Sequence, residues 1–314
     1  MERLVFVLPC YNEDEILEIT IERLLFLMKD LIERKKISED SYMLFVNDGS
    51  SDNTWEIIKK NYLNSKYVNG IKLSANVGHQ NALWAGLMTA KEDANIMITI
   101  DADLQDDINV VEEMIDKYYD GNQIVYGIKK KRLADPWAKR VSAEGFYKLM
   151  NLLGVRTIYN HADFRLMSKI AVQALSKYKE RNLFLRGIVP LLGFKTECVY
   201  EDIKEREAGK SKYSLKKMLN LATNAITSFS IKPLALIGWL GCIIVLFCTI
   251  MIVQAIIAHI SGDTVAGWTS MMISIWFIGG VQLISLGIVG EYIGKLYIET
   301  KERPLYFIEQ ALIH

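Results

Sequence analysis

The pattern of apolar and polar positions divides the chain into two unlike parts. Over roughly the first two-thirds, short apolar runs alternate with longer segments of mixed polarity, and beyond residue 231 apolar residues dominate. Short runs rich in Ile and Val suit strands buried on both faces, whereas mixed segments with helical periodicity suit amphipathic helices. We therefore expect an α/β domain followed by a membrane-embedded part.

The first part predicts five strands, each followed by a polar cluster. We place the strands at residues 4–8, 42–46, 70–73, 96–100 and 123–127. Helices are expected at residues 16–34, after residue 52 or 53, and at residues 80–90. This alternation argues for a mostly parallel sheet with helices on both faces. Because the carboxyl ends of parallel strands share one edge, Glu13, Asp48 and Asp101 should converge there.

The fourth predicted strand ends in an acidic stretch, in which Asp101 and Asp103 are followed by Gln105. Two carboxylates and an amide oxygen suit Mg²⁺ or Mn²⁺, and such an ion keeps positions for substrate phosphates. A solvated acidic loop is the alternative for this stretch taken alone. No G-x-G-x-x-G follows the first strand and no G-x-x-x-x-G-K-[ST] occurs, which disfavours a Rossmann dinucleotide site and a P-loop.

Basic residues follow the fifth strand and recur before the apolar part. Lys129 begins a run of four, Arg140 comes later, and a glycine-containing basic loop spans residues 206–213. Such side chains can hold phosphate oxygens beside a carboxylate–metal site, although a charge run is more often a solvated face. Asp163, next to Phe164, is expected to be a partly desolvated carboxylate.

The apolar part contains two runs, at about residues 231–260 and 268–293, each longer than the roughly 20 residues that span a bilayer as a helix. Lys and Arg flank the pair on both sides, and the linker at residues 259–267 has none. By the positive-inside rule, we expect both termini and the α/β domain to be cytoplasmic, at the inner membrane. Gly290 and Gly294 form a small-xxx-small pair, so a homo-oligomer is a further hypothesis.

These patterns give four regions. Residues 1–213 form the cytoplasmic domain, and residues 214–230 form an amphipathic helix on the inner leaflet. Residues 231–294 hold two transmembrane helices with a short external linker, and residues 295–314 form a cytoplasmic tail. The zero net charge gives no reason to expect nucleic acid, and the four cysteines show no metal-ligand spacing.

Five segments, taken together and in order, resemble glycosyltransferase family 2. They are VLPCYNE (7–13), VNDGSSDNT (46–54), NVGHQNAL (76–83), DADLQD (101–106) and REAGKSKY (206–213). The branch that looks most similar comprises the polyprenyl-phosphate glycosyltransferases, which include bactoprenol glucosyltransferases and dolichol-phosphate mannose synthase. Residues 290–306 resemble the tail of its membrane-anchored bacterial members. The resemblance implies a Rossmann-like GT-A fold and inverting sugar transfer from a nucleotide sugar to a polyprenyl phosphate.

The resemblance also implies roles for individual residues. The nucleotide would be held by Pro9, Tyr11, Glu13, Asp48 and Asp101, and Mg²⁺ or Mn²⁺ by Asp101, Asp103 and Gln105. Asp103 and Asp163 would be catalytic, and phosphate would be met by Lys129, Arg140, Arg206 and Lys212. Lys129 stands where the family often has arginine, so it would meet phosphate as a point charge. The expected donor is UDP-glucose or another UDP-hexose, and the expected acceptor is undecaprenyl phosphate.

Two other functions compete with this interpretation. A processive polysaccharide synthase of the same superfamily would carry a Q-x-x-R-W motif and more membrane helices, and this sequence has neither. A membrane-tethered nucleotide-sugar-binding protein without catalysis is a second alternative, and the intact DADLQ stretch and Asp163 argue against it. The sequence leaves open which sugar and which nucleotide base are used.

Overall fold

The computed structural model describes residues 1–129, 161–201, 232–260 and 267–314. These residues belong to two compact units. One unit contains the sheet together with the C-terminal residues Arg303–His314, and the other contains the two long apolar helices. The predicted amphipathic helix at residues 214–230 and most of the predicted external linker lie outside the described residues.

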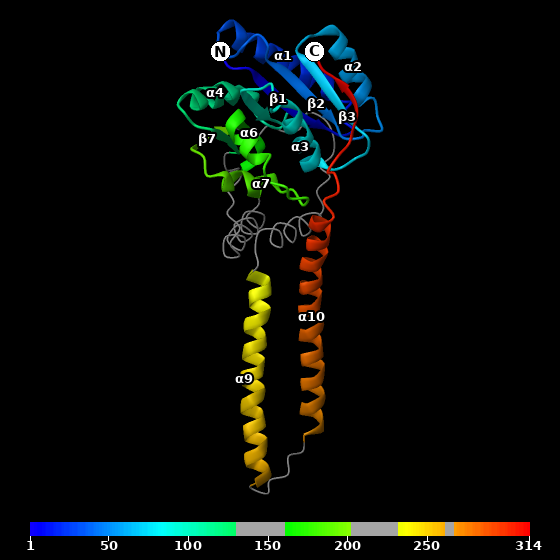
Figure 1. Ribbon diagram of the computed structural model, residues 1–314, viewed down its shortest axis with the longest axis vertical. Coiled ribbons are helices and arrows are strands. Elements are labelled where there is room, and N and C mark those ends of the chain that lie inside the picture. Colours follow the sequence, from blue (N-terminus) through cyan, green and yellow to red (C-terminus); the bar gives the residue numbers. More distant parts are fainter. Residues whose placement is uncertain (130–160, 202–231, 261–266) are drawn as a thin grey trace. The chain divides into compact units, whose positions relative to one another are not determined.

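An eight-stranded sheet, formed by the described residues, is the centre of the first unit (Figure 1). Its order is β7-β5-β6-β4-β1-β2-β3-β8. The strands are β1 (Leu4–Cys10), β2 (Tyr42–Asn47), β3 (Val68–Leu73), β4 (Ile96–Thr99), β5 (Ile124–Lys129), β6 (His161–Ser168), β7 (Thr196–Glu201) and β8 (Ile308–Leu312). β1 pairs in parallel with β2 and β4, β2 with β3, and β5 with β7, whereas β6 and β8 are antiparallel to their neighbours.

Helices cover the sheet because each has an apolar face to bury. They are α1 (Leu17–Glu33), α2 (Thr54–Asn64), α3 (His79–Ala90), α4 (Val111–Tyr119), α6 (Lys169–Leu175) and α7 (Leu185–Ile188), with 3-10 turns η1 (Ile108–Val110) and η2 (Val189–Leu192). α3 approaches the sheet most closely at Gly86, where an added Cβ would lie 2.4 Å from Val7 and 2.8 Å from Val46. Gly86 therefore lets the first turn of α3 reach the carboxyl edge of β1 and β2.

The prediction of a mostly parallel α/β sheet is confirmed, and all five predicted strands are present with slightly different ends. The sequence pattern did not reveal β6, β7 or β8. In β6 the apolar alternation is interrupted by Asp163 and Arg165. These charged residues suggest a polar loop rather than a strand, although both side chains are buried. The strand between β4 and β5 is therefore a feature that only the fold shows.

The C-terminal segment, expected to be a tail, forms part of the sheet unit. Helix α10 (Trp268–Thr300) extends past residue 294, and β8 then adds to the edge of β3. The indole N–H of Trp55 donates to Gln310 Oε1 (3.0 Å), and the ring of His314 stacks on Tyr62 at 4.1 Å. Residues after α10 are thus bound to the same sheet as the first residues of the chain.

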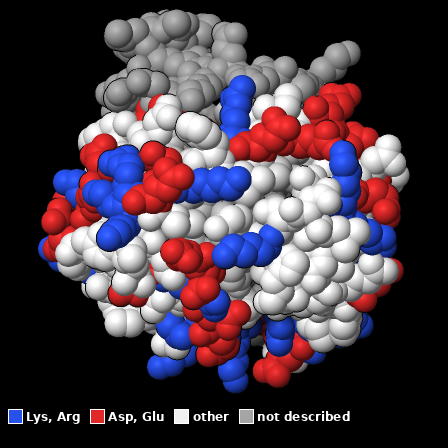
Figure 2. Space-filling model, turned by 90° about the horizontal axis from the view of Figure 1, so that it is seen from above, with Lys and Arg blue, Asp and Glu red and all other residues white. Residues whose placement is uncertain are grey.

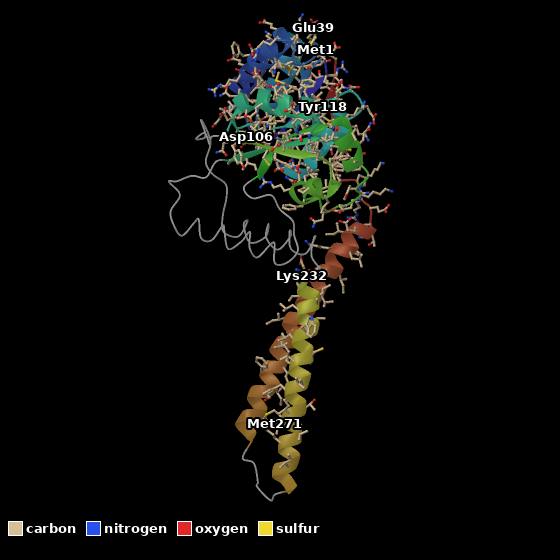
Figure 3. The ribbon with its side chains drawn as sticks, turned by 90° about the vertical axis from the view of Figure 1, so that its left-hand side faces the viewer. Met1, Glu39, Asp106, Tyr118, Lys232 and Met271 are labelled. Carbon is tan, nitrogen blue, oxygen red and sulfur yellow. The ribbon has the colours of Figure 1, made fainter. Side chains whose placement is uncertain are left out.

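The second unit contains α9 (Lys232–Ile260) and α10, which run next to each other (Figures 1 and 3). Both are long and apolar enough to cross a membrane, judged by length and composition. The qualifying stretches, Lys232–Met251 and Phe277–Thr300, have mean hydropathies of 2.6 and 1.4 and no buried share. Their exposed apolar side chains need a partner other than water.

Charged side chains of both signs are interspersed on the face seen in Figure 2. Ion pairs among the described residues include Arg34 with Glu112 and Lys36 with Asp116. This face carries no broad patch of one sign, which agrees with the zero net charge of the sequence.

Deleting residues 306–314 should lower the thermal unfolding midpoint of the sheet unit. The deletion removes the β3–β8 ladder and the bond between Trp55 and Gln310. With about 1 kcal/mol for each lost hydrogen bond, the midpoint should fall by about 5–10 °C, measured by scanning fluorimetry in detergent. Glu309→Gln is the control, because it breaks only the half-exposed ion pair with Lys72 and should shift the midpoint by less than about 2 °C. An unchanged midpoint after the deletion would mean that β8 does not stabilise the sheet.

Candidate functional site

Acidic residues converge at the carboxyl ends of β1, β2 and β4, as the sequence predicts. The backbone N–H of Asp48, just after β2, donates to the carbonyl of Cys10 at 2.9 Å. Cys10 ends β1, and burial raises the pKa of its thiol, helped by the nearby charges of Glu13, Asp101 and Asp52. These acids come from three different loops, so the sheet edge is the feature that collects them.

The loops after β1 and β2 are tied to each other by hydrogen bonds. Asn12 N–H donates to Ser50 Oγ (3.0 Å), and Asn12 Oδ1 accepts from the N–H of Ser51 (2.9 Å). Asn12 has a left-handed backbone (φ 53°), which asparagine tolerates better than most residues. Of the predicted nucleotide residues, Pro9 is buried in β1 and Tyr11 is exposed in the loop that follows.

Asp48 is buried, and its carboxylate shapes the loop before α3. It accepts from the backbone N–H groups of Val77 (2.7 Å) and Gly78 (3.0 Å). Burial raises the pKa of Asp48, and the two backbone donors act in the opposite direction. Gly49 has φ 64°, and a Cβ there would come within 2.6 Å of the backbone nitrogen of Asn76. The end of β2 and the start of α3 are therefore held in close contact.

The antiparallel strand β6 brings Asp163 to the acidic stretch after β4. Thr99 lies opposite Arg165 in the β4–β6 register. Continuing that register by two residues sets Asp101 opposite Asp163, because the two chains run in opposite directions. The hydroxyl of Thr99 also donates to the carbonyl of Asp163, which fixes the strand end. Two carboxylates far apart in the sequence thus become neighbours.

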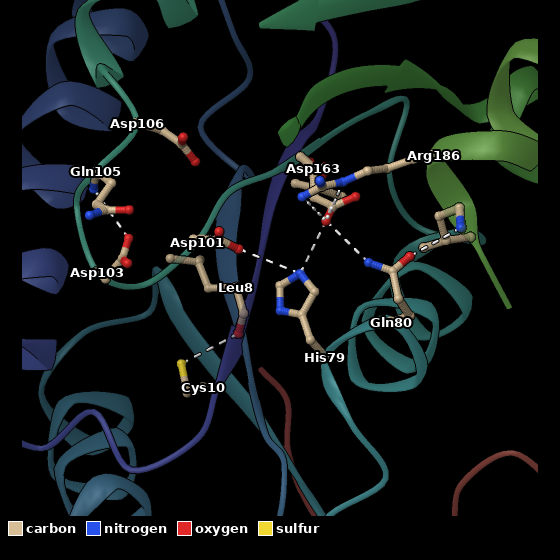
Figure 4. Close-up of polar contacts among 12 residues, drawn as sticks. Leu8, Cys10, His79, Gln80, Asp101, Asp103, Gln105, Asp106, Asp163 and Arg186 are labelled. Carbon is tan, nitrogen blue, oxygen red and sulfur yellow. Dashed lines mark hydrogen bonds and ion pairs between the residues drawn. The ribbon is translucent and has the colours of Figure 1, made fainter. Parts of the chain in front are cut away.

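Asp163 is buried and surrounded by hydrogen-bond donors (Figure 4). Its carboxylate accepts from Gln80 Nε2 (3.1 Å), from Arg186 Nη2 (3.0 Å) and Nε (3.2 Å), and from Arg165 Nη2. Burial would raise the pKa of Asp163, but Arg186, His79 and Arg165 outweigh it and hold the pKa well below its usual range. Asp163 is therefore ionised at neutral pH and poorly suited to accept a proton.

His79 lies between the two neighbouring carboxylates in Figure 4. Its Nε2 is 3.6 Å from Asp101 Oδ1 and 3.5 Å from Asp163 Oδ2. Desolvation lowers the pKa of His79, but the bond with Asp163 and the charge of Asp101 outweigh it and raise the pKa to about 8. Desolvation and the charges of Asp106, Asp163 and Asp103 raise the pKa of Asp101 to about 6, against the effect of His79.

The three predicted metal ligands lie on one loop, residues 101–107 (Figure 4). Asp103 Oδ1 accepts from the backbone N–H of Gln105 (3.2 Å), and Leu104 between them has φ 55°. Within the described residues, no group of three or more His, Cys, Asp or Glu side chains is arranged to hold a metal ion. The assignment of Asp101, Asp103 and Gln105 as metal ligands therefore stays a prediction.

Lys129, predicted to meet phosphate, is paired with the same loop. Its Nζ lies 3.0 Å from Asp106 Oδ1, and Asp106 is buried. Glu201, at the end of β7, is also buried, and its Oε2 accepts from the backbone N–H of Asp107 at 2.9 Å. Burial and the nearby charge of Asp106 raise the pKa of Glu201 to about 7. The other predicted phosphate ligands, Arg140, Arg206 and Lys212, lie outside the described residues.

Four residues of this site received no role from the sequence. His79 and Gln80 belong to the segment NVGHQNAL, so the family-like motif pointed to them without indicating a contact. Arg165 is two residues after Asp163 in β6, and strand alternation could have put both side chains on one face. Arg186 lies in the short helix α7 and reaches Asp163 across the fold, which no local pattern indicates.

Comparison with known proteins identifies the family. The model of glycosyl transferase family 2 matches residues 5–176. The chain is 51% identical to the uncharacterized glycosyltransferase YkoT of Bacillus subtilis, covering 98% of this chain and 91% of that protein. It is 39% identical to the prophage bactoprenol glucosyl transferase homolog of Escherichia coli, covering 98% and 99%. A solved mannosyltransferase from Pyrobaculum calidifontis, in complex with GDP-Man and Mn²⁺, is 14% identical with a TM-score of 0.44, covering 95% and 85%.

The chain therefore belongs to glycosyl transferase family 2 and is a glycosyltransferase. Within that family it falls in the branch that includes the bactoprenol glucosyl transferases, which it matches over nearly its full length. The mostly parallel sheet with flanking helices is the GT-A arrangement that the sequence predicts for this family.

Replacing Glu201 with glutamine should stabilise the protein at high pH. The folded pKa of about 7 lies above the ordinary value of 4.5, so the folded state loses stability as pH rises from about 4.5 to 7. At pH 8 the full difference of about 2.5 units corresponds to about 3 kcal/mol. Denaturant unfolding curves should show the largest gain for Glu201→Gln at pH 8 and little gain near pH 5.

The exposed residue Glu197 on the same strand supplies the control. Glu197→Gln, a change at an exposed carboxylate, should alter the free energy of unfolding by less than about 0.5 kcal/mol. A pH-independent difference between Glu201→Gln and the unsubstituted protein would mean that Glu201 does not titrate in this range.

Proposed function

We propose that the protein transfers a sugar from a nucleotide sugar to a polyprenyl phosphate, with inversion at the anomeric carbon. The observation that carries the proposal is the meeting of Asp101 and Asp163 at one sheet edge, in a chain related along its length to bactoprenol glucosyl transferases. Donor diphosphate and acceptor phosphate would meet at that edge. The product would be a polyprenyl-monophosphate sugar for glycosylation of the cell envelope.

A divalent cation, Mg²⁺ or Mn²⁺, fits the oxygen atoms of Asp101, Asp103 and Gln105. Mg²⁺ often takes only one or two carboxylates from the protein, because substrate phosphates and water complete its coordination. The crowding of acids that raises the pKa of Asp101 also fits, since a cation would relieve their repulsion. When bound, the cation would neutralise charge developing on the departing nucleoside diphosphate.

The nucleoside would lie on the joined loops after β1 and β2, against Pro9, Tyr11 and Glu13. Asp48 would act there by holding the backbone of residues 77–78, which its buried carboxylate contacts. Relatives named as glucosyl transferases favour a glucosyl donor, and we propose UDP-glucose or another UDP-hexose.

The acceptor phosphate would attack the anomeric carbon from the face opposite the leaving diphosphate. A phosphate is already ionised near pH 7, with a second pKa of about 6, so the reaction needs no strong general base. We propose that Asp163 orients Arg186 and His79 instead, because its low pKa makes it a weak proton acceptor. Arg140, Arg206 and Lys212 would bind phosphate oxygens.

Helices α9 and α10 would hold the enzyme at the inner membrane, where the acceptor lipid lies. β8 pairs with β3, so the last strand belongs to the same compact unit as the strands that precede α9 in the chain, which supports one side of the membrane for both. Two crossings in opposite directions satisfy that requirement. The Lys and Arg residues that flank the apolar runs support a cytoplasmic position for both termini.

The test is transfer of labelled sugar to lipid. Membranes containing the full-length protein are incubated with undecaprenyl phosphate and a panel of nucleotide sugars, and the lipid product is weighed by mass spectrometry. One nucleotide sugar should give a lipid carrying one sugar. Asp103→Ala should reduce transfer by about 100-fold or more, and EDTA should stop it until Mg²⁺ or Mn²⁺ is added.

Glu113→Ala, which alters an exposed acid on α4, is the control and should transfer normally. Undiminished turnover in EDTA would contradict the metal-dependent scheme. A polymer in place of a single sugar would favour a processive synthase, and nucleotide-sugar binding without any labelled lipid would favour a binding protein.

Replacing Asp163 with asparagine should lower kcat/KM by about 100-fold, because the amide cannot balance the charges of Arg165 and Arg186 and the site would shift. Asp163 is ionised from pH 6 to pH 9, so the variant should lose no limb of the pH–rate profile. A limb due to His79 should move to lower pH, because Asp163 helps to raise the pKa of His79 to about 8. Initial rates across that range give the result. Loss of an acidic limb in the variant would restore the general-base role.

A further inference from the structure

Two buried acids, Asp106 and Glu201, and the partly buried Lys129 lie at the end of the loop formed by residues 101–107. The reaction described above gives this group no role. Asp106 is 3% exposed and Glu201 is fully buried. Lys129 Nζ approaches Asp106 Oδ1 at 3.0 Å, and Glu201 holds the backbone N–H of Asp107 at 2.9 Å. Burying a charge costs free energy unless the charge is paired, so a group of buried charges suggests a functional role.

The two strand residues in this group are fixed by the sheet. Lys129 ends β5 and Glu201 ends β7, and the two lie opposite each other in the parallel register. Lys129 therefore contacts the side chain of Asp106, and the side chain of Glu201 contacts the backbone of Asp107. The position of residues 106–107 is thus set by two paired strands rather than by the loop itself.

The loop between these anchors and the end of β4 is held in an unfavourable shape. Leu104 has φ 55°, a region that leucine rarely adopts, and its side chain is 4% exposed. Such a conformation persists only where surrounding contacts determine it. Thr20 of α1 donates to the carbonyl of Ala102 at 2.8 Å. The backbone N–H of Asp101 donates to the carboxylate of Asp106, which favours the charged form of Asp106. Contacts therefore fix the chain on both sides of Leu104.

We propose that Lys129 and Asp106, supported by Glu201, are positioning residues that hold this loop so that Asp101, Asp103 and Gln105 present their oxygens to one divalent cation. The inference rests on the proposed metal-dependent function and deepens it. Lys129 Nζ lies 3.0 Å from Asp106 Oδ1, which adds a positioning role to the phosphate binding that the sequence predicts for Lys129. Asp106 Oδ2 and Glu201 Oε1 accept no hydrogen bond from described residues, which leaves the pair of acids dependent on the lysine charge.

The test measures metal binding directly. Full-length protein in detergent is titrated with Mn²⁺, alone and with UDP, and free Mn²⁺ is followed by its electron paramagnetic resonance signal. Lys129→Met should raise the dissociation constant for Mn²⁺ by about 10–100-fold, as expected when an outer partner of metal ligands is lost. The KM for Mn²⁺ in the transfer assay should rise more than kcat falls.

Matched variants separate positioning from general stability. Lys72→Met removes a lysine of similar exposure that pairs with Glu309 at 3.0 Å on the far edge of the sheet, and it should leave Mn²⁺ binding unchanged. Lys129→Arg keeps the charge and should restore binding to within about threefold. Asp106→Asn should weaken binding as Lys129→Met does, and the double variant should be no weaker than the worse single variant, as for two members of one pair.

Each outcome decides between the alternatives. Circular dichroism checks folding, and if Lys129→Met does not fold, the nearly isosteric Asp106→Asn decides instead. Equal Mn²⁺ affinity for unsubstituted protein and variants would overturn the inference and leave the proposed function intact. Fully additive effects in the double variant would show that Lys129 and Asp106 do not act as a pair. Unsubstituted protein that binds no Mn²⁺ and transfers sugar in EDTA would overturn the proposed function as well.

Discussion

A carboxylate that is removed from water needs positive neighbours or hydrogen-bond donors, and the burial of Asp163 imposes that need on three elements at once. β6 supplies Arg165, α7 supplies Arg186, and the first turn of α3 supplies Gln80. Gln80 in turn accepts from the backbone N–H of Leu185 at 3.1 Å, so the short helix α7 is held by the same group. The site is therefore assembled around one charge.

Two groups of charges with opposite balance flank the acidic loop. Around Asp163, two arginines and a histidine surround one carboxylate, whereas around Asp106 one lysine serves two buried acids. Asp101 belongs to the loop between them, and its pKa responds to both groups. In the proposed reaction, the positive group around Asp163 would face the acceptor phosphate, and the acidic group around Asp106 would favour a cation near the donor.

Local patterns in the sequence were sufficient for the parallel strands and for the acidic loop, because buried strands and their polar ends leave a direct signal. The insertion of β6 between β4 and β5 was not predictable, since its buried Asp163 and Arg165 break the apolar alternation. The family-like motifs indicated which residues matter but not what those residues contact. Asp48, for example, is predicted to bind the nucleotide, and the structure adds that its carboxylate holds a neighbouring loop. Partners such as Arg186 depend on tertiary structure alone.

The sheet is completed by a strand that follows both apolar helices in the chain. Because domains begin to fold during synthesis from the N-terminal side, β1 to β7 are available well before β8 leaves the ribosome. Until then β3 presents an unpaired edge, which is a site for unwanted pairing with other strands. Membrane insertion of α9 and α10 would therefore precede closure of the sheet, and a chain whose second helix failed to insert in the right direction would leave that edge open.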